Sequence, residues 1–173
     1  MGNIKGAAIN SLAYTGIVKL SQYIGRKKFT IAQMHNAGGK ALFEFLSDCL
    51  VGDFELARLD RPTKILLLNE DENKTLSKAT DTDFIYLTSK PEKVYDEVEG
   101  IVRYSFIIPQ DIFANTKFNA VGLYTDTATT SDVDDYAAFC SISTDKLNDI
   151  SISSVLVLDW ELHISNPNQA SNN

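Results

Sequence analysis

The stretch from Val155 to Ile164, VLVLDWELHI, constrains the fold more than any other feature of the chain, because large apolar residues occupy every second position. One face of a strand with this pattern carries five apolar side chains: Leu156, Leu158, Trp160, Leu162 and Ile164. The other face carries Asp159, Glu161 and His163. An apolar face of this length must be covered by another layer. The sequence therefore predicts a sheet that packs on a second layer, with this last strand closing the structure.

Other segments predict strands by alternation, or by short apolar runs between turn residues. They are residues 14–20, 27–34, 61–71, 81–91, 100–110, 118–126 and 135–143. We expect the first two to form a hairpin through Gly25, which can adopt the positive φ of a tight turn. In residues 100–110, Val102, Tyr104, Phe106 and Ile108 share one face. Residues 69–78 are polar and charged, which predicts an exposed loop.

Only residues 37–51 have the spacing of a helix. Leu42, Phe45, Leu46, Cys49 and Leu50 lie on one helical face. Asn36 or a following glycine would begin this helix, and Gly52 stands where a left-handed C-terminal cap is expected.

The predicted fold is mainly β: an antiparallel β-sandwich with one α-helix, 37–51, packed against it. We expect a single domain over residues 1–173, in which the N-terminal hairpin and the helix pack on the sandwich, with a flexible C-terminal tail at 166–173. The predicted core contains seven large side chains: Leu42, Phe45, Leu46, Tyr104, Phe106, Leu158 and Trp160.

The composition bounds the partners. The chain has a net charge of −7, and its one basic cluster is Arg26 to Lys28, so we expect no nucleic-acid partner. No apolar run approaches the ~18 residues of a membrane span, so we expect a soluble protein without a membrane partner. Cys49 and Cys140 are far apart in the sequence, and we expect both to be buried free thiols.

The candidate chemical groups are few. His35 precedes Asn-Ala-Gly-Gly, which favours a turn and capping role, with an anion-binding turn as the alternative. His163 is expected to be solvated or at an interface. The acidic loop 125–135 contains Asp126, Asp132, Asp134 and Asp135, which favours a solvated loop and leaves calcium binding as an alternative. We predict no catalytic residue, no cofactor and no metal site.

The second half of the chain resembles the C-terminal pattern of bacteriophage tail-fibre, baseplate and collar proteins. The residues that carry this resemblance fall into three segments: Gly122, Leu123 and Tyr124; Ala137, Ala138 and Phe139; and Leu158, Trp160, Leu162 and Ile164. The N-terminal half also looks like short phage virion proteins in which a hairpin leads into one helix and then into an RPTKI strand.

The resemblance implies a non-enzymatic virion protein that is assembled in the host cytoplasm. It would form homo-oligomers and connect other phage virion proteins, as an adaptor, collar, baseplate or fibre-attachment subunit. A carbohydrate- or peptide-binding β-sandwich, with Trp160 and the tyrosines as ligand platforms, is the alternative function. An enzyme is a third possibility, for which the sequence offers no constellation of residues.

Overall fold

The structure is a computed structural model that describes residues 13–59, 61–80, 82–95, 99–148, 150 and 154–165. The predicted tail, 166–173, lies outside these residues. The ten strands are β1 (Ala13–Ile24), β2 (Lys27–Gly38), β3 (Pro62–Glu70), β4 (Leu76–Lys78), β5 (Ile85–Tyr86), β6 (Glu92–Tyr95), β7 (Glu99–Ile108), β8 (Ala120–Thr125), β9 (Ala138–Ser141) and β10 (Val155–Ser165). The four described helices are α1 (Lys40–Val51), α2 (Phe54–Leu59), α3 (Gln110–Asn115) and α4 (Thr144–Asn148).

All ten strands belong to one sheet, with the order β4-β3-β8-β9-β2-β1-β10-β7-β6 and with β5 paired to β3. Every pairing is antiparallel. Strand β2 joins two halves, because it pairs with β1 along most of its length and with β9 through Ala37 and Gly38. We call β2-β1-β10-β7-β6 the long-stranded half and β4-β3-β8-β9 the short-stranded half.

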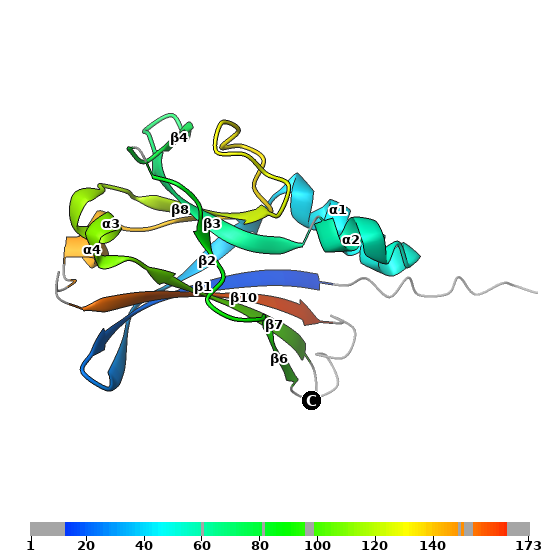
Figure 1. Ribbon diagram of the computed structural model, residues 1–173, viewed down its shortest axis with the longest axis horizontal. Helices are drawn as coiled ribbons and strands as arrows, with labels where there is room; N and C mark the ends of the chain where they lie inside the picture. Colours follow the sequence, from blue (N-terminus) through cyan, green and yellow to red (C-terminus); the bar gives the residue numbers. More distant parts are fainter. Residues whose placement is uncertain are drawn as a thin grey trace, which may run out of the picture.

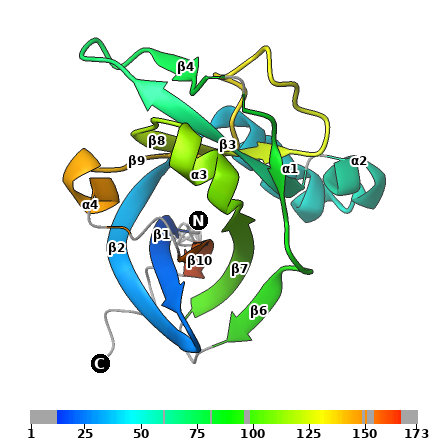
Figure 2. The ribbon, with the colours of Figure 1, turned by 60° about the vertical axis from the view of Figure 1, so that its left-hand side comes forward.

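The sheet curves so that the short-stranded half lies over the long-stranded half (Figure 2). Beyond β5, the Leu87 N–H donates to the carbonyl of Thr63, and the Thr88 N–H donates to the carbonyl of Ser105 in β7. This segment links the two halves on the side away from β2. The structure confirms a mainly antiparallel β fold, although the two layers that we predicted are halves of one continuous sheet.

Strand β10 lies in the centre of the long-stranded half, paired with β1 on one side and with β7 on the other. Strand β10 therefore has a paired strand on each side, whereas the sequence predicted only that it closes the structure. The predicted inner face is buried as far as the structure describes it: Leu156, Leu158, Trp160 and Leu162 are each at most 3% exposed.

The main core lies between the inner faces of the two halves. Of the seven side chains predicted for it, five are buried there: Leu42, Tyr104, Phe106, Leu158 and Trp160. Phe45 and Leu46 are half-buried and pack against this cluster from α1. The inner face of the short-stranded half contributes Ile65, Leu67, Val121 and Leu123.

Strands β3 and β8 are buried on both faces, which explains the continuous apolar run of β3. Leu66 and Leu68 point away from the main core and join a second apolar cluster with Ala120, Tyr124 and Ala128. Phe84 and Val133, from the segments that follow β4 and β8, pack against this cluster. The outer face of the short-stranded half is thus covered by loops of the same chain.

Glycines set two boundaries that the sequence predicted. Ile24 pairs with Lys27, so the β1–β2 hairpin has a two-residue turn whose first residue, Gly25, has φ +62°. Helix α1 ends at Gly52, which has the left-handed φ of 78°. The helix begins at Lys40, after a cap at Gly39, rather than at residue 37, because Ala37 and Gly38 belong to β2.

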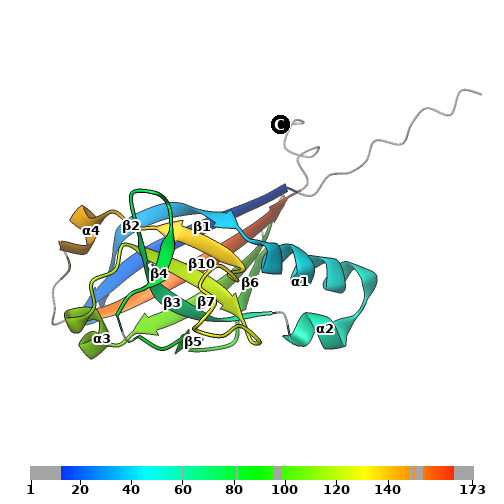
Figure 3. The same ribbon diagram turned by 90° about the horizontal axis from the view of Figure 1, so that it is seen from above.

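The prediction of one helix is wrong, since the described residues form four. The three additional helices have only five or six residues each. Helices α1 and α2 lie at one end of the sheet, and α3 and α4 lie at the opposite end (Figures 1 and 3). None of the helices in the described part of the chain is long and apolar enough to cross a membrane.

The Gly-Leu-Tyr segment of β8 has a steric explanation. Gly122 and Tyr124 lie two residues apart and so face the same side of the strand. The Tyr124 ring lies over Gly122, where an added Cβ would be 2.5 Å from a ring carbon. The ring cannot move freely, because it is fully buried and its hydroxyl donates to the Val133 carbonyl at 2.7 Å.

We therefore expect Gly122→Ala to destabilise the fold by about 1 to 3 kcal/mol, the usual cost of overpacking a core. Urea unfolding followed by circular dichroism measures this change. Tyr124→Leu removes the ring and the hydroxyl. Gly122→Ala should therefore destabilise the Tyr124→Leu variant less than it destabilises the wild type. An equal effect of the alanine in both backgrounds would contradict this explanation.

Candidate functional site

The outer face of the long-stranded half carries a group of ionised side chains that we call the outer charge cluster. It consists of Lys19, Lys28, Glu92, Arg103, Asp159 and Glu161. Antiparallel register brings these residues together, since Asp159 lies opposite Lys19 and Ser105, and Arg103 lies opposite Glu161 and Glu92. Directly opposite residues in a sheet point to the same side.

Two carboxylates at the centre of this cluster are nearly buried. The side chains of Asp159 and Glu161 are 8% and 3% exposed. Glu161 accepts from Lys19 Nζ at 2.8 Å and from Arg103 Nε at 3.0 Å. Asp159 pairs with Lys28 and accepts from the Ser105 hydroxyl at 2.6 Å. Glu161 is therefore held by cations of both adjacent strands, and Asp159 is held by a cation of β2, one strand further away.

These contacts decide the ionisation of Glu161. Burial alone would raise the pKa of this carboxyl, but hydrogen bonds from Lys19, Arg103 and His163 outweigh burial and lower it. Burial alone would lower the pKa of Arg103, but the hydrogen bond to Glu161 and the nearby carboxylates outweigh burial and raise this pKa. Both groups are ionised at neutral pH, so the cluster is a fixed array of charges on the sheet.

A second feature is a cleft at the end of the sheet where α1 and α2 lie, which we call the basic cleft. Its volume is about 690 Å³. Six parts of the chain line it: α1 through Phe45, α2 through Arg58, the start of β3 with Arg61 before it, the segment from Tyr86 to Pro91, β7 through Tyr104, and the residue after β8, Asp126. A concave site assembled from several elements, with apolar walls and a few polar groups, is the usual form of a ligand site.

The charge of the basic cleft is opposite to that of the chain. Arg58, Arg61 and Lys90 line it together with one carboxylate, Asp126, although acidic residues outnumber basic ones by 23 to 16 in the whole sequence. Within the described residues none of these three cations forms an ion pair. Asp126 accepts a hydrogen bond from the Thr63 hydroxyl at 3.2 Å.

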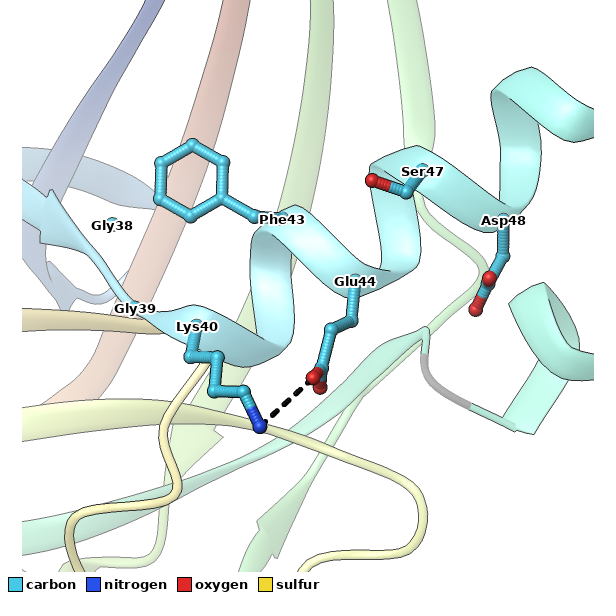
Figure 4. Close-up of a pocket in the computed structure, with 7 residues that line it drawn as sticks. All are labelled: Gly38, Gly39, Lys40, Phe43, Glu44, Ser47 and Asp48. Carbon is cyan, nitrogen blue, oxygen red and sulfur yellow. Dashed lines mark ion pairs between the residues drawn. The ribbon is translucent and has the colours of Figure 1, made fainter.

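A further hollow follows the exposed side of α1, lined by residues 38–40, Phe43, Glu44, Ser47 and Asp48 (Figure 4). Two of its three charged side chains form an ion pair, since Lys40 Nζ lies 3.0 Å from Glu44. The Gly39 N–H at the start of the helix donates to the Ala137 carbonyl at 2.7 Å. The hollow is therefore a surface beside one helix, in which Lys40, Glu44 and the Gly39 N–H have partners within the protein.

Both histidines lie in strands, and the structure contradicts the prediction for His35. His35 is an exposed residue within β2, opposite Ile17, so the predicted turn and capping role is wrong, and the anion-binding alternative lapses with that turn. Strand β2 continues through His35 to Gly38, because β1 pairs with it as far as Asn36 and β9 pairs with Ala37 and Gly38. His163 is half-buried, and its Nε2 lies 3.3 Å from Glu161, which places it beside the outer charge cluster.

In the acidic loop, Asp132, Asp134 and Asp135 are exposed, while Asp126 faces the basic cleft. The described residues hold no group of three or more histidine, cysteine or acidic side chains arranged to bind a metal ion. In the basic segment, Arg26 lies in the hairpin turn and Lys28 belongs to β2.

The two cysteines differ. Cys140 is buried in the main core, and burial raises the pKa of its thiol to about 12. Cys49 is exposed, so the prediction of a buried thiol is wrong for this residue. Among the described side chains of α1, Ala41 and Leu42 in the first turn are the buried ones, and Cys49 lies two turns beyond Leu42.

Sequence reasoning missed both the outer charge cluster and the basic cleft. Alternation placed Asp159, Glu161 and His163 on one face, which was the available signal for the cluster. It gave no information about the position of β1, β2 and β7, and those strands supply the cations. The Trp160 side chain, which the alternative function used as a ligand platform, is fully buried and offers no surface to a ligand.

Comparison with known protein families, with curated proteins and with solved structures finds no match to this chain.

Proposed function

We propose that this chain is a non-enzymatic structural subunit of a bacteriophage virion, an adaptor, collar, baseplate or fibre-attachment protein that forms homo-oligomers. The resemblance in sequence suggests the virion, and the outer face of the long-stranded half supports the association. Two of the three segments that carry the resemblance lie on adjacent strands, since Gly122 to Tyr124 lies in β8 and Ala138 to Phe139 in β9, while the third lies in β10 of the long-stranded half.

The outer charge cluster is the observation that carries this proposal. It contains three cations and three carboxylates, so the face is locally neutral on a chain of net charge −7. Two copies of an acidic protein repel each other over most of their surfaces. They meet at the lowest electrostatic cost through a neutral face whose charges are already paired.

Apolar side chains flank the cluster on the same face. Ile107 lies opposite Val157, and Val155 lies opposite Tyr23, towards the β1–β2 turn. Ile107 and Val155 are 42% and 48% exposed. The face therefore offers exposed apolar area at one end and paired polar groups beside it, and contact surfaces between protein subunits combine an apolar part with a polar rim.

The native mass of the purified chain, measured by light scattering together with negative-stain images, tests the proposal. A closed ring or a trimer is the expected result, because symmetric oligomers of one subunit close upon themselves. A particle that remains a monomer at the highest soluble concentration would overturn the proposed homo-oligomer.

The variant Ile107→Glu tests which face associates. It adds a charge to the proposed contact surface, and we expect the dissociation constant to increase by about tenfold or more, equivalent to ~1.4 kcal/mol. Val51→Glu is the matched control, since Val51 is 78% exposed on α1, outside this face. Analytical ultracentrifugation of both variants measures the change, and equal weakening by the two would place the contact elsewhere.

A further inference from the structure

We propose that the basic cleft binds a small amphipathic anion: a ligand with one phosphate or carboxylate group on a flat apolar body. This inference does not depend on the proposed virion role. It rests on the cations that line the cleft, on the aromatic groups beside them and on the size of the cavity.

The groups that would bind the anionic end of the ligand are Arg58, Arg61 and Lys90. All three are exposed, and within the described part of the chain none has a carboxylate partner. By contrast, Lys19, Lys28 and Arg103 of the outer charge cluster are each paired. A guanidinium presents donors in a planar fork that matches the oxygens of a phosphate or carboxylate. Charges of one sign that line a cleft also concentrate ions of the opposite sign.

The aromatic side chains of the same cleft would contact the apolar end of the ligand. Tyr86 is 62% exposed in the short strand β5, although tyrosine usually buries its ring. Phe45 is half-buried, and Tyr104 is 5% exposed at the inner end of the cleft. A flat ring placed against Tyr86 and Phe45 would cover apolar surface that water now contacts.

The size of the cleft favours a small molecule. Its volume of about 690 Å³ falls within the roughly 300 to 1,000 Å³ of ligand pockets. Among the described lining residues Asp126 lowers the positive charge from three to two, which equals the charge of a doubly ionised phosphate and exceeds that of one carboxylate. A ligand with an anion and no apolar body would leave the aromatic part of the cleft uncovered.

The test is a titration of the full ¹⁵N-labelled chain with four probes: phenyl phosphate, benzoate, inorganic phosphate and phenol. We expect saturable amide shifts near Arg58, Thr63 and Ser89 with phenyl phosphate or with benzoate, and the tighter of the two identifies the anion. Inorganic phosphate and phenol should each bind at least ~10-fold more weakly, because each lacks one half of the recognised chemistry.

Two variants locate the site. Arg58→Gln combined with Arg61→Gln should weaken binding of the charged aromatic probe by about tenfold or more. The matched control is Arg26→Gln combined with Lys27→Gln, which removes two exposed cations from the hairpin and should leave the affinity unchanged. Tyr86→Ala should weaken phenyl phosphate and leave inorganic phosphate unchanged. Thermal unfolding of each variant verifies that it is folded.

Several results would overturn the inference. They are the absence of binding by both phenyl phosphate and benzoate, equal affinity for inorganic phosphate or for phenol, and equal losses in the cleft and hairpin double variants. Because none of these measurements depends on the oligomeric state, they do not bear on the proposed virion role.

Discussion

Replacement of Trp160 with alanine is expected to destabilise the fold by about 3 to 5 kcal/mol, the range for removal of a buried aromatic side chain. Trp160 is fully buried at the centre of β10, opposite Val18 of β1 and Tyr104 of β7. Its loss leaves a cavity in the main core between the two halves of the sheet, and the hydrogen-bonded strands around it can move only partly to fill it. The midpoint and slope of urea unfolding, followed by circular dichroism, measure the change.

Trp160→Phe provides the control for volume. The indole Nε1 is buried, and no hydrogen-bond acceptor for it is present among the described residues. Phenylalanine keeps most of the apolar contact and removes this unsatisfied donor, so it should destabilise the fold much less than alanine does. An alanine variant with the unfolding midpoint of the wild type would show that the indole is not in the core.

Glu161→Gln is expected to have the second largest effect on stability. It should lower the free energy of unfolding by about 2 to 3 kcal/mol at pH 7. Removal of one partner from a buried ion pair typically costs about 3 to 5 kcal/mol. The expected loss is smaller because Lys19 and Arg103 are about one third exposed and can recover some hydration. Glu92→Gln is the matched control, since Glu92 also pairs with Arg103 but is 64% exposed, and it should change stability by less than ~1 kcal/mol.

The effect of Glu161 also depends on pH, with a defined sign. Its pKa is lowered in the folded state, so the unfolded chain binds the proton more readily as the pH falls. The stabilisation is complete above the ordinary glutamate pKa of 4.5 and is lost as the pH falls through the lowered value. The difference in unfolding free energy between wild type and Glu161→Gln should therefore narrow in acid. A difference that stays constant from pH 7 to pH 3 would contradict the role of the ionised carboxylate.

The sequence predicted individual elements well where the pattern depends on one strand or one helix alone. Alternation in β7 and β10 correctly separated inner from outer side chains, because the period of two is a local property. The hairpin turn at Gly25 and the end of α1 at Gly52 followed from the backbone freedom of glycine. Helix α2 was missed although its signal was present: Asp53 Oδ1 accepts from the Leu56 N–H, as an N-terminal cap does.

The arrangement of the elements could not be predicted in the same way. Nothing in the alternation of β10 indicates that its neighbours are β1 and β7, so the ion pairs of Glu161 with Lys19 and Arg103 were not foreseeable. The basic cleft was even harder to predict, because its lining residues extend from Phe45 to Asp126 along the chain. Sites of this kind depend on tertiary contacts rather than on spacing in the sequence.

The central position of β10 bears on how the protein folds as it leaves the ribosome. Strand β1 can form its hairpin with β2 early, but its other edge pairs with a strand in which Glu161 lies 142 positions beyond Lys19. Until those residues are synthesised, β1 and β7 each retain an unpaired edge, which is a template for intermolecular pairing. Contacts between such distant residues also slow folding. The nascent chain must therefore remain in a state prone to aggregation until nearly all of the described residues have been synthesised, and chaperones that shield strand edges should increase its soluble yield.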